Sequence, residues 1–230
     1  MPQRRQAPSP LFPFSLALLN RVAPQGSAVK RLDGYLALRQ QGGVASTFRR
    51  FVRTLHELEP YLRSLKQLCC PGCGVAETLN CHSKLFGNDP DSGSGGRAQR
   101  GQRVWCSNRG QRGGCGRSFC IFLTEVLPRH TVSSAALWAL LGRWLGGGSI
   151  KAAAEALALP FGLETLYHLL QRMRLRLSAL RSALSGQAPP PASSHPDPLL
   201  QTVEHLRGVF AGSKCPVAEF QLHFQRPLLE

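Results

Sequence analysis

The chain has 230 residues, and with 43% of them hydrophobic it can bury a core, which excludes disorder throughout. Its formal net charge of +15 favours a polyanionic partner, because basic side chains release counterions from the phosphates that they neutralise. The most apolar stretch, residues 135–145, is interrupted by Arg143 and is too short to cross a bilayer, so we expect a cytoplasmic protein without a membrane partner.

The first expected domain, residues 1–66, is a basic helical region. A helix is expected over residues 28–40. From residue 46 to residue 68, apolar residues recur every three or four positions, which predicts an amphipathic helix with Ser46 or Thr47 as its N-cap. Pro60 should kink this helix or divide it, since proline has no N–H to donate.

Residues 67–124 change character, because cysteines, glycines and short polar runs replace the helical pattern. Short strands are expected over residues 77–85 and 102–106. Between them the sequence GNDPDSGSGGRAQRGQ, residues 87–102, has the composition of a loop.

Two pairs of cysteines in this region have the character of metal ligands. Cys70 and Cys73 form a Cys-x-x-Cys turn within CCPGCG, and such a turn supplies two of the four ligands of tetrahedral zinc. Cys106 and Cys115 are separated by eight residues, but Cys115-Gly116 is followed by a basic and then an aromatic residue, as at the end of a zinc-ribbon knuckle. We therefore expect one structural Zn²⁺, since four protein ligands leave no position for a reactive water.

The remaining cysteines are interpreted as small buried or surface residues. They are Cys69, Cys81, Cys120 and Cys215. Cys81 and the adjacent His82 lie in the middle of the region and could replace one ligand. A disulfide framework is the weaker alternative, because a basic chain without a clear signal peptide points to a reducing compartment.

The helical period returns after Pro128, and residues 131–185 are expected to form a three-helix domain. A helix over residues 134–145 precedes a second helix that Ser149 can cap, and the turn ALPFG, residues 158–162, precedes a third near Leu163. Small alanines at the helix contact, a tight turn and basic residues on the last helix are typical of a helix-turn-helix. The alternative is a plain helical hairpin with an exposed polar face. Residues 186–230 are interpreted as a linker and tail with one short helix over residues 199–210.

If the last helix of this domain enters a major groove, its outward residues divide into two groups. Positions early in the helix would face base edges, and later arginines would face phosphates. The base-facing candidates are Thr165, His168, Gln171 and Arg172, together with Glu164, which repels phosphates unless it accepts a hydrogen bond from cytosine. The phosphate candidates on this helix are Arg174 and Arg176. In the cysteine-rich region the candidate DNA-binding residues are Arg109, Arg112 and Arg117.

The order of these parts resembles the N-terminal DNA-binding region of bacterial insertion-sequence transposases. The resemblance lies in CCPGCG, in RVWCSNRGQRGGCGRSF and in SIKAAAEALALPFGLETLYHLL, and covers roughly residues 67–180. In that family a zinc ribbon precedes a helix-turn-helix, and the pair binds element ends. The resemblance therefore implies a mainly α fold with a small β zinc ribbon, and double-stranded DNA as the partner. The spacing of eight residues in the second cysteine pair departs from the usual two.

Such transposases continue into a ribonuclease-H-like domain with three metal-binding carboxylates. The 45 residues after Ser185 are too few for that fold, so no catalytic role is carried over and we expect a protein that is not an enzyme. The leading hypothesis is a sequence-preferring DNA-binding protein, bound to the nucleoid, which is either a regulator or a fragment of a mobile element. One alternative is a nuclease or transposase whose catalytic carboxylates cannot be identified from the sequence. The other is an RNA-binding or protein-interaction ribbon, which would favour exposed aromatics on a sheet. Trp105 and Phe119 could serve that purpose, but we interpret both as part of the ribbon core. The oligomeric state is left open.

Overall fold

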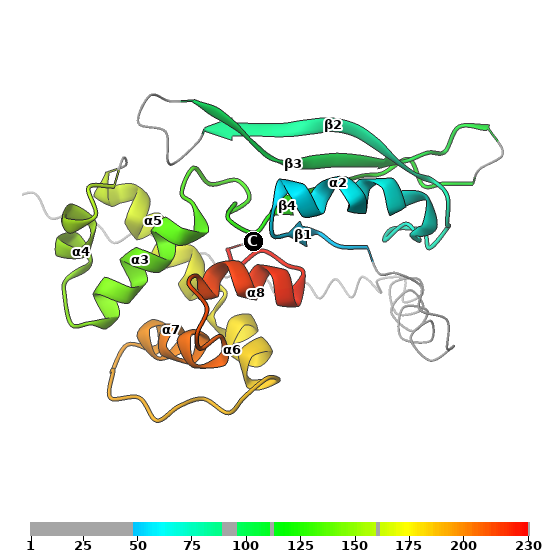
Figure 1. The fold of residues 1–230 in the computed structure, drawn as a ribbon. Coiled ribbons are helices and arrows are strands. Elements are labelled where there is room, and N and C mark those ends of the chain that lie inside the picture. The colour runs from blue at the N-terminus through cyan, green and yellow to red at the C-terminus, as the bar shows by residue number, and fades with distance from the viewer. Residues whose placement is uncertain (1–47, 89–95, 111–112, 160–161, 230) are drawn as a thin grey trace, which may run out of the picture. The chain divides into compact units, whose positions relative to one another are not determined.

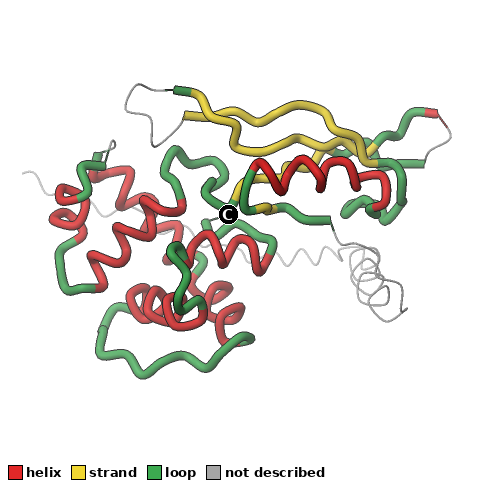
Figure 2. Tube along the Cα trace, in the orientation of Figure 1, coloured by secondary structure: helices red, strands yellow, loops and turns green. Residues whose placement is uncertain are grey.

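The computed structural model describes residues 48–88, 96–110, 113–159 and 162–229 (Figure 1). The helix expected over residues 28–40 and the expected N-caps Ser46 and Thr47 lie outside them. The described residues form seven α-helices and one four-stranded sheet (Figure 2), a mixed α/β fold in which the sheet is the smaller part. They belong to one compact unit, residues 45–230.

The sheet is built around a long antiparallel hairpin. Its strands are β1 (Phe51–Val52), β2 (Leu79–Asn88), β3 (Arg97–Cys106) and β4 (Ser118–Leu123), and their order in the sheet is β1-β4-β3-β2. Strand β3 pairs antiparallel with β2 and with β4, whereas β1 runs parallel to β4. The loop expected over residues 87–102 is wrong at both ends, because β2 continues to Asn88 and β3 begins at Arg97. Backbone pairing between the two strands outweighs the loop-like composition of these residues.

Helix α2 (Leu55–Arg63) begins later than its apolar pattern predicts. The N-cap is Thr54, whose Oγ1 accepts a hydrogen bond from the Glu57 backbone N–H at 3.2 Å. The expected helix start near residue 46 is wrong, because Phe51 belongs to β1 and is paired with Phe122 of β4. The helix runs through Pro60 to Arg63, and a 3₁₀ turn, η1 (Ser64–Gln67), follows it.

A hydrophobic core joins α2 and η1 to the sheet. It contains Leu58 and Leu65 from the helical segment, and Val104 and Ile121 from the middle strands, each at most 2% exposed. Leu68 continues this core to the turn that carries the first cysteine pair. The packing therefore fixes the position of that turn against the end of β3.

Six further helices follow the sheet, and the first three lie where the sequence predicts helices. The helices are α3 (Ser134–Leu145), α4 (Ile150–Ala156), α5 (Leu163–Leu175), α6 (Leu177–Ser185), α7 (Pro198–Val209) and α8 (Pro216–Phe224). The hydroxyls of Ser133 and Ser149 accept hydrogen bonds from backbone N–H groups in the first turns of α3 and α4, as N-caps do. Among the described residues, no helix has both the length and the apolar character that crossing a bilayer requires.

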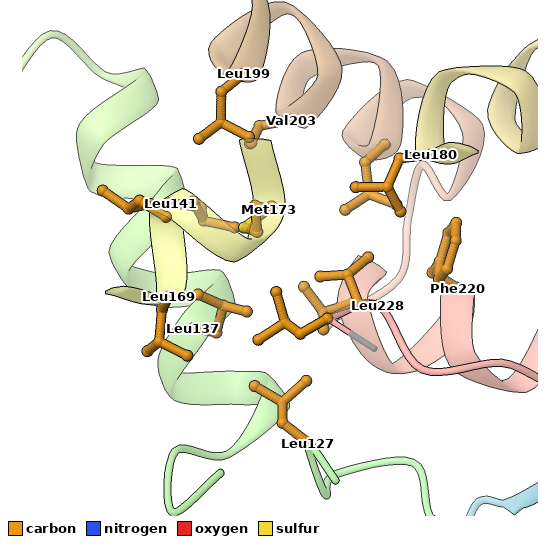
Figure 3. Close-up of a cluster of buried hydrophobic side chains, with 14 of the residues drawn as sticks. Leu127, Leu137, Leu141, Leu169, Met173, Leu180, Leu199, Val203, Phe220 and Leu228 are labelled. Atoms are coloured by element: carbon orange, nitrogen blue, oxygen red, sulfur yellow. The ribbon is translucent and has the colours of Figure 1, made fainter. Parts of the chain in front are cut away.

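Helices α7 and α8 are part of the core rather than of a separate tail. Figure 3 shows Leu199 and Val203 of α7 and Phe220 of α8 together with Met173 of α5 and Leu137 of α3. All five side chains are at most 1% exposed. The sequence analysis did not predict helix α8. Its apolar residues form a buried face only through contacts with helices that lie far away in the sequence.

Two glutamines, one in α8 and one at its C-cap, tie the helices to the sheet. The side-chain amide of Gln221, which is fully buried, donates to the carbonyls of Thr124 at 2.9 Å and Val126 at 3.0 Å. The side-chain oxygen of Gln225 accepts hydrogen bonds from the backbone N–H groups of Arg50 at 2.7 Å and Phe51 at 2.9 Å. Within the described ranges β1 is an edge strand, so Gln225 satisfies backbone donors at this edge that a neighbouring strand would otherwise bind.

Candidate metal centre and the surface of α5

The first cysteine pair lies in a tight turn between η1 and β2. The Cys70 backbone N–H donates to the Val75 carbonyl at 3.0 Å, and the Gly74 N–H donates to the Cys70 carbonyl at 2.8 Å. Gly74 has a φ of +75°, a value that glycine adopts without strain. The Gly72 N–H points at Cys70 Sγ from 3.3 Å, as a donor stabilising a thiolate would.

The second pair lies where β3 ends and β4 begins. Cys106 closes β3, and its backbone N–H donates to the Arg117 carbonyl at 2.9 Å. The Cys115 N–H lies 3.2 Å from Cys106 Sγ. No larger residue fits at Gly114, because a Cβ there would lie 2.0 Å from the Ser107 carbonyl oxygen. In both pairs a backbone N–H therefore faces one of the sulfur atoms.

The four sulfur atoms form one compact cluster. Cys70 Sγ lies 3.7 Å from Cys115 Sγ, and Cys73 Sγ lies 3.8 Å from Cys106 Sγ. All four lie within 4.8 Å of one another, so the cluster can hold a metal ion. These distances are much longer than a disulfide bond of about 2.05 Å, and all eight cysteines have free thiols.

The cluster has a buried side and an exposed side, and this affects the thiol pKa values. Cys70 is 2% exposed and Cys106 is fully buried, whereas Cys73 is exposed. Burial raises the pKa of Cys70 to about 12, although the N–H groups of Gly72 and Cys73 favour its thiolate. Burial also acts to raise the pKa of Cys106, but hydrogen bonds with Thr78 and with the Cys115 N–H outweigh it and lower this pKa to about 7.

The other cysteines and His82 lie apart from the cluster. Cys69 is exposed although it precedes Cys70 directly, so the turn selects the second of the two adjacent cysteines. Cys81 is exposed on β2, and the Nδ1 atom of its neighbour His82 is 3.1 Å from the Ser83 hydroxyl. Neither residue replaces one of the four clustered thiols.

Helices α4 and α5 pack on α3 through small and branched side chains. Ala153 and Ala154 of α4, Leu140 of α3 and Leu166 of α5 form a cluster whose members are at most 7% exposed. The alanines let the helices approach closely, as the sequence predicts. The chain between α4 and α5 is six residues long, of which residues 160 and 161 lie outside the described part.

The outward face of α5 carries most of the predicted DNA contacts. Thr165, His168, Gln171 and Arg172 are all exposed, whereas the intervening Leu169 is buried. Tyr167 is 53% exposed, although Leu166 and Leu169 near it on the helix are buried. The Glu164 carboxylate lies 3.6 Å from His168 Nε2, so the one acidic residue of α5 borders the polar face.

Of the two arginines expected to meet phosphates, one forms a salt bridge and the other is half-buried. Arg174 Nη2 lies 3.1 Å from Asp197 Oδ2. Arg176 is half-buried between α5 and α6, and its Nε atom is enclosed and has no hydrogen-bond partner among the described residues. It lines a hollow of about 370 Å³ together with Arg172 and Leu229.

In the cysteine-rich region, Arg109 and Arg117 are exposed, and Arg112 lies outside the described residues. The Arg109 guanidinium lies over the Trp105 ring, 5.5 Å from its centre, and the Trp105 indole donates to the Gly116 carbonyl at 3.3 Å. Phe119 packs into the sheet core, with its ring centre 5.8 Å from that of Phe48. Of the two aromatics considered for RNA binding, Phe119 is therefore partly buried against the sheet core, and the Trp105 ring is already covered by Arg109.

Three basic residues that the sequence does not relate, Arg100, His130 and Arg172, lie near one another. Arg100 Nη2 of β3 donates to the His130 carbonyl at 2.8 Å. The pKa of His130 is lowered by burial and also by the positive charges of Arg172 and Arg100. No spacing in the sequence relates these three residues, because they come from a strand, a loop and a helix.

Comparisons of the chain with protein-family models, with curated proteins and with solved structures found no match. The function must therefore be inferred from the cysteine cluster and from the surface of α5.

Proposed function

We propose that the protein binds double-stranded DNA through α5 and that a structural Zn²⁺ held by Cys70, Cys73, Cys106 and Cys115 stabilises its sheet. In this proposal the sheet with its two cysteine turns is a zinc ribbon. Helices α3, α4 and α5 form a helix-turn-helix, in the arrangement found in insertion-sequence transposases. The observation that carries the proposal is the exposed polar face of α5, whose buried face packs on α3 and α4.

The geometry and the donor set favour zinc as the metal. Four thiolates around Zn²⁺ at about 2.3 Å in a tetrahedron lie about 3.8 Å from one another. The sulfur atoms of Cys70 and Cys115 are 3.7 Å apart, and those of Cys73 and Cys106 are 3.8 Å apart. Thiolates are soft ligands, which magnesium and calcium do not prefer. The metal would be held by two turns that secondary structure already positions.

A structural role for this metal follows from the ligand count. Four protein ligands close a tetrahedral site and leave no position for an activated water. The metal would compensate for the small core of the sheet, because its binding free energy adds to the folding free energy. We therefore propose a protein that acts by binding rather than by catalysis.

The α4–α5 pair supports DNA binding by the length of α5 and by the side chains on its exposed face. Helix α4 has 7 residues and α5 has 13, and α5 is the helix that offers an exposed polar face. Residues four apart on a helix share a face, so His168 and Arg172 point the same way, with Gln171 beside them. Gln and Arg are suited to hydrogen bonds with adenine and guanine edges in the major groove. The net charge of +15 adds attraction to any duplex.

The arginines around this face differ in what they can contribute. Arg172 is exposed and carries no salt bridge to a described carboxylate, so it is the proposed base-reading arginine. To bind a phosphate, Arg174 must first break its salt bridge with Asp197. Arg176 is half-buried and is proposed as a weaker phosphate contact at the end of α5.

A selection from a pool of random duplexes tests the proposal. The full chain should enrich a short common sequence at low salt and keep its preference at higher salt, and it should carry one zinc ion per chain by elemental analysis. Enrichment of single-stranded or RNA competitors over duplex would contradict the proposed partner. A zinc-free protein that still selects a duplex would contradict the metal assignment alone.

A further inference from the structure

Strands β2 and β3 extend beyond the rest of the sheet as a two-stranded arm, defined here as residues 84–88 and 97–100. Lys84 and Leu85 form the base of the arm, because their partners Gln102 and Gly101 still pair with β4. Strand β4 pairs with β3 only from Gly101 to Trp105. Beyond Gly101, the pairs Phe86–Gln99 and Asn88–Arg97 join β2 and β3 alone. Figure 1 shows the two strands as a long hairpin.

One face of the arm is polar, basic and exposed. Residues opposite each other in a sheet share a face, and residues two apart on one strand share a face. This face therefore carries Lys84, Phe86, Asn88, Gln99 and Arg97. Gln99 is half-buried, and the other four residues are exposed. Among these four, Phe86 is 53% exposed, which is unusual for a phenylalanine. The described parts of both strands contain no acidic residue.

The opposite face is covered by the protein itself. Leu85, Gly87 and Ala98 are half-buried. Arg100 lies against Gly87 so closely that a Cβ there would be 2.3 Å from Arg100 Cδ. From this position Arg100 Nη2 donates to the His130 carbonyl in the loop before α3. The arm is thus held on one side by the Arg100 hydrogen bond, and its other side is exposed with respect to the described part of the chain.

We propose that this face of the arm lies in the major groove of duplex DNA as a second contact beside α5. The proposal rests on the proposed function and extends it to a surface with no assigned role. A two-stranded antiparallel ribbon has the width of the major groove. Asn88 supplies an amide that pairs with an adenine edge, and Phe86 supplies an apolar contact for a thymine methyl group. The amide of Gln99 can act in the same way once its Nε2 leaves the Gly101 carbonyl, to which it donates at 3.3 Å. Lys84 and Arg97 supply two phosphate contacts.

The charge contribution is tested with Lys84→Ala/Arg97→Ala in the full chain against a pool of random duplexes. If both side chains bind phosphates, their removal should lower the salt slope by about 1.8 and weaken binding roughly 60-fold at about 0.1 M salt. The matched control is Arg63→Ala/Arg207→Ala, which removes the same charge from exposed positions on α2 and α7. The control should lose much less affinity. If both double variants lost the same affinity for the duplex, the arm contact would be overturned, because the loss would then depend only on the net charge of the protein.

Photo-crosslinking gives a test that does not depend on removing charge. A photoreactive phenylalanine analogue at position 86 should crosslink to the duplex, whereas the same analogue at Leu55, an exposed apolar position of α2, should not. Duplex bound by the protein without crosslinks at position 86 above those at position 55 would overturn the arm while leaving the α5 proposal intact. A wild-type chain that binds no duplex would overturn both. Preferential crosslinking to single strands or RNA would also overturn the arm proposal.

Discussion

Arg174 of α5 and Asp197 at the start of α7 form a salt bridge, with Arg174 Nη2 at 3.1 Å from Asp197 Oδ2. The same carboxylate caps α7, because Asp197 Oδ1 accepts a hydrogen bond from the Leu199 N–H at 2.7 Å. An arginine that could meet a DNA phosphate is therefore held by an internal carboxylate, and this carboxylate competes with the DNA.

Asp197→Asn should strengthen duplex binding. Asparagine keeps the N-cap, so α7 should remain folded, while the negative charge that holds Arg174 is removed. An exposed pair of this kind contributes about 0.2–1 kcal/mol, so affinity should rise by up to about 5-fold. Duplex titrations measure the change. Glu59→Gln, which removes a charge beside Arg63 on α2, is the control and should have a smaller effect.

Cys70→Ser should release the metal, and Cys69→Ser should not. Cys70 Sγ lies in the cluster of four sulfur atoms, whereas the adjacent Cys69 is exposed and outside it. Loss of one thiolate opens the tetrahedral site, so zinc content should fall and the sheet should unfold at lower temperature. Zinc analysis and thermal unfolding of the two variants provide the comparison. If Cys69→Ser is the variant that loses zinc, the assignment of the first cysteine pair is wrong.

Gln221→Met should destabilise the whole compact unit. The buried amide of Gln221 donates to the Thr124 and Val126 carbonyls and so joins α8 to the end of the sheet. Methionine has a similar size but no donor, which leaves the Val126 carbonyl unsatisfied and should cost about 2 kcal/mol of unfolding free energy. Urea unfolding measures this loss. Gln67→Met at an exposed position of η1 should change stability by less than about 0.5 kcal/mol.

His130 should make folding sensitive to mild acid. Its pKa in the folded protein is lowered by burial and by the nearby Arg172 and Arg100 charges. The unfolded chain takes up a proton near the ordinary histidine pKa of about 6.5, before the folded protein does. The stability contribution is therefore complete above about pH 6.5 and is lost as pH falls toward the folded-state pKa.

His130→Gln should reduce this sensitivity, because glutamine does not titrate and the backbone carbonyl that Arg100 binds is retained. Melting temperatures of wild type and variant should converge as the pH is lowered from neutral. Acid release of the metal affects both proteins equally, so it cancels in the difference. His56→Gln, at an exposed position of α2, should behave as wild type does. A constant difference across the pH range would rule out a titrating His130 as the cause.

The sequence alone predicts the local features of this protein well. The helix expected over residues 134–145 is α3, and Ser149 caps α4 as its position before an alanine-rich run indicates. The structure also brings together the four cysteines that the spacing singled out. The two helix features depend on residues within one or two turns of each other. The cluster joins positions distant in sequence, and it was predictable because thiols spaced as in a metal knuckle have a known chemical use.

The features that the sequence did not predict depend on distant contacts. Phe51 fits a helical period but is drawn into β1 by pairing with Phe122. Arg97 belongs to a loop by composition but becomes part of β3 because β2 offers it a partner. Likewise, Val217 of α8 is buried only because α3 and α7 surround it. In each case a partner far along the chain decides the outcome.

The central claim, that α5 reads duplex DNA, is tested most directly by the affinity ratio between a selected duplex and its scrambled version. Arg172→Ala should reduce this ratio by about 5- to 150-fold, because one bidentate contact to a base discriminates by about 1–3 kcal/mol. The control Arg207→Ala, which removes an exposed arginine from α7, should leave the ratio unchanged. An unchanged ratio in Arg172→Ala, with both duplexes bound as tightly as by wild type, would contradict the account.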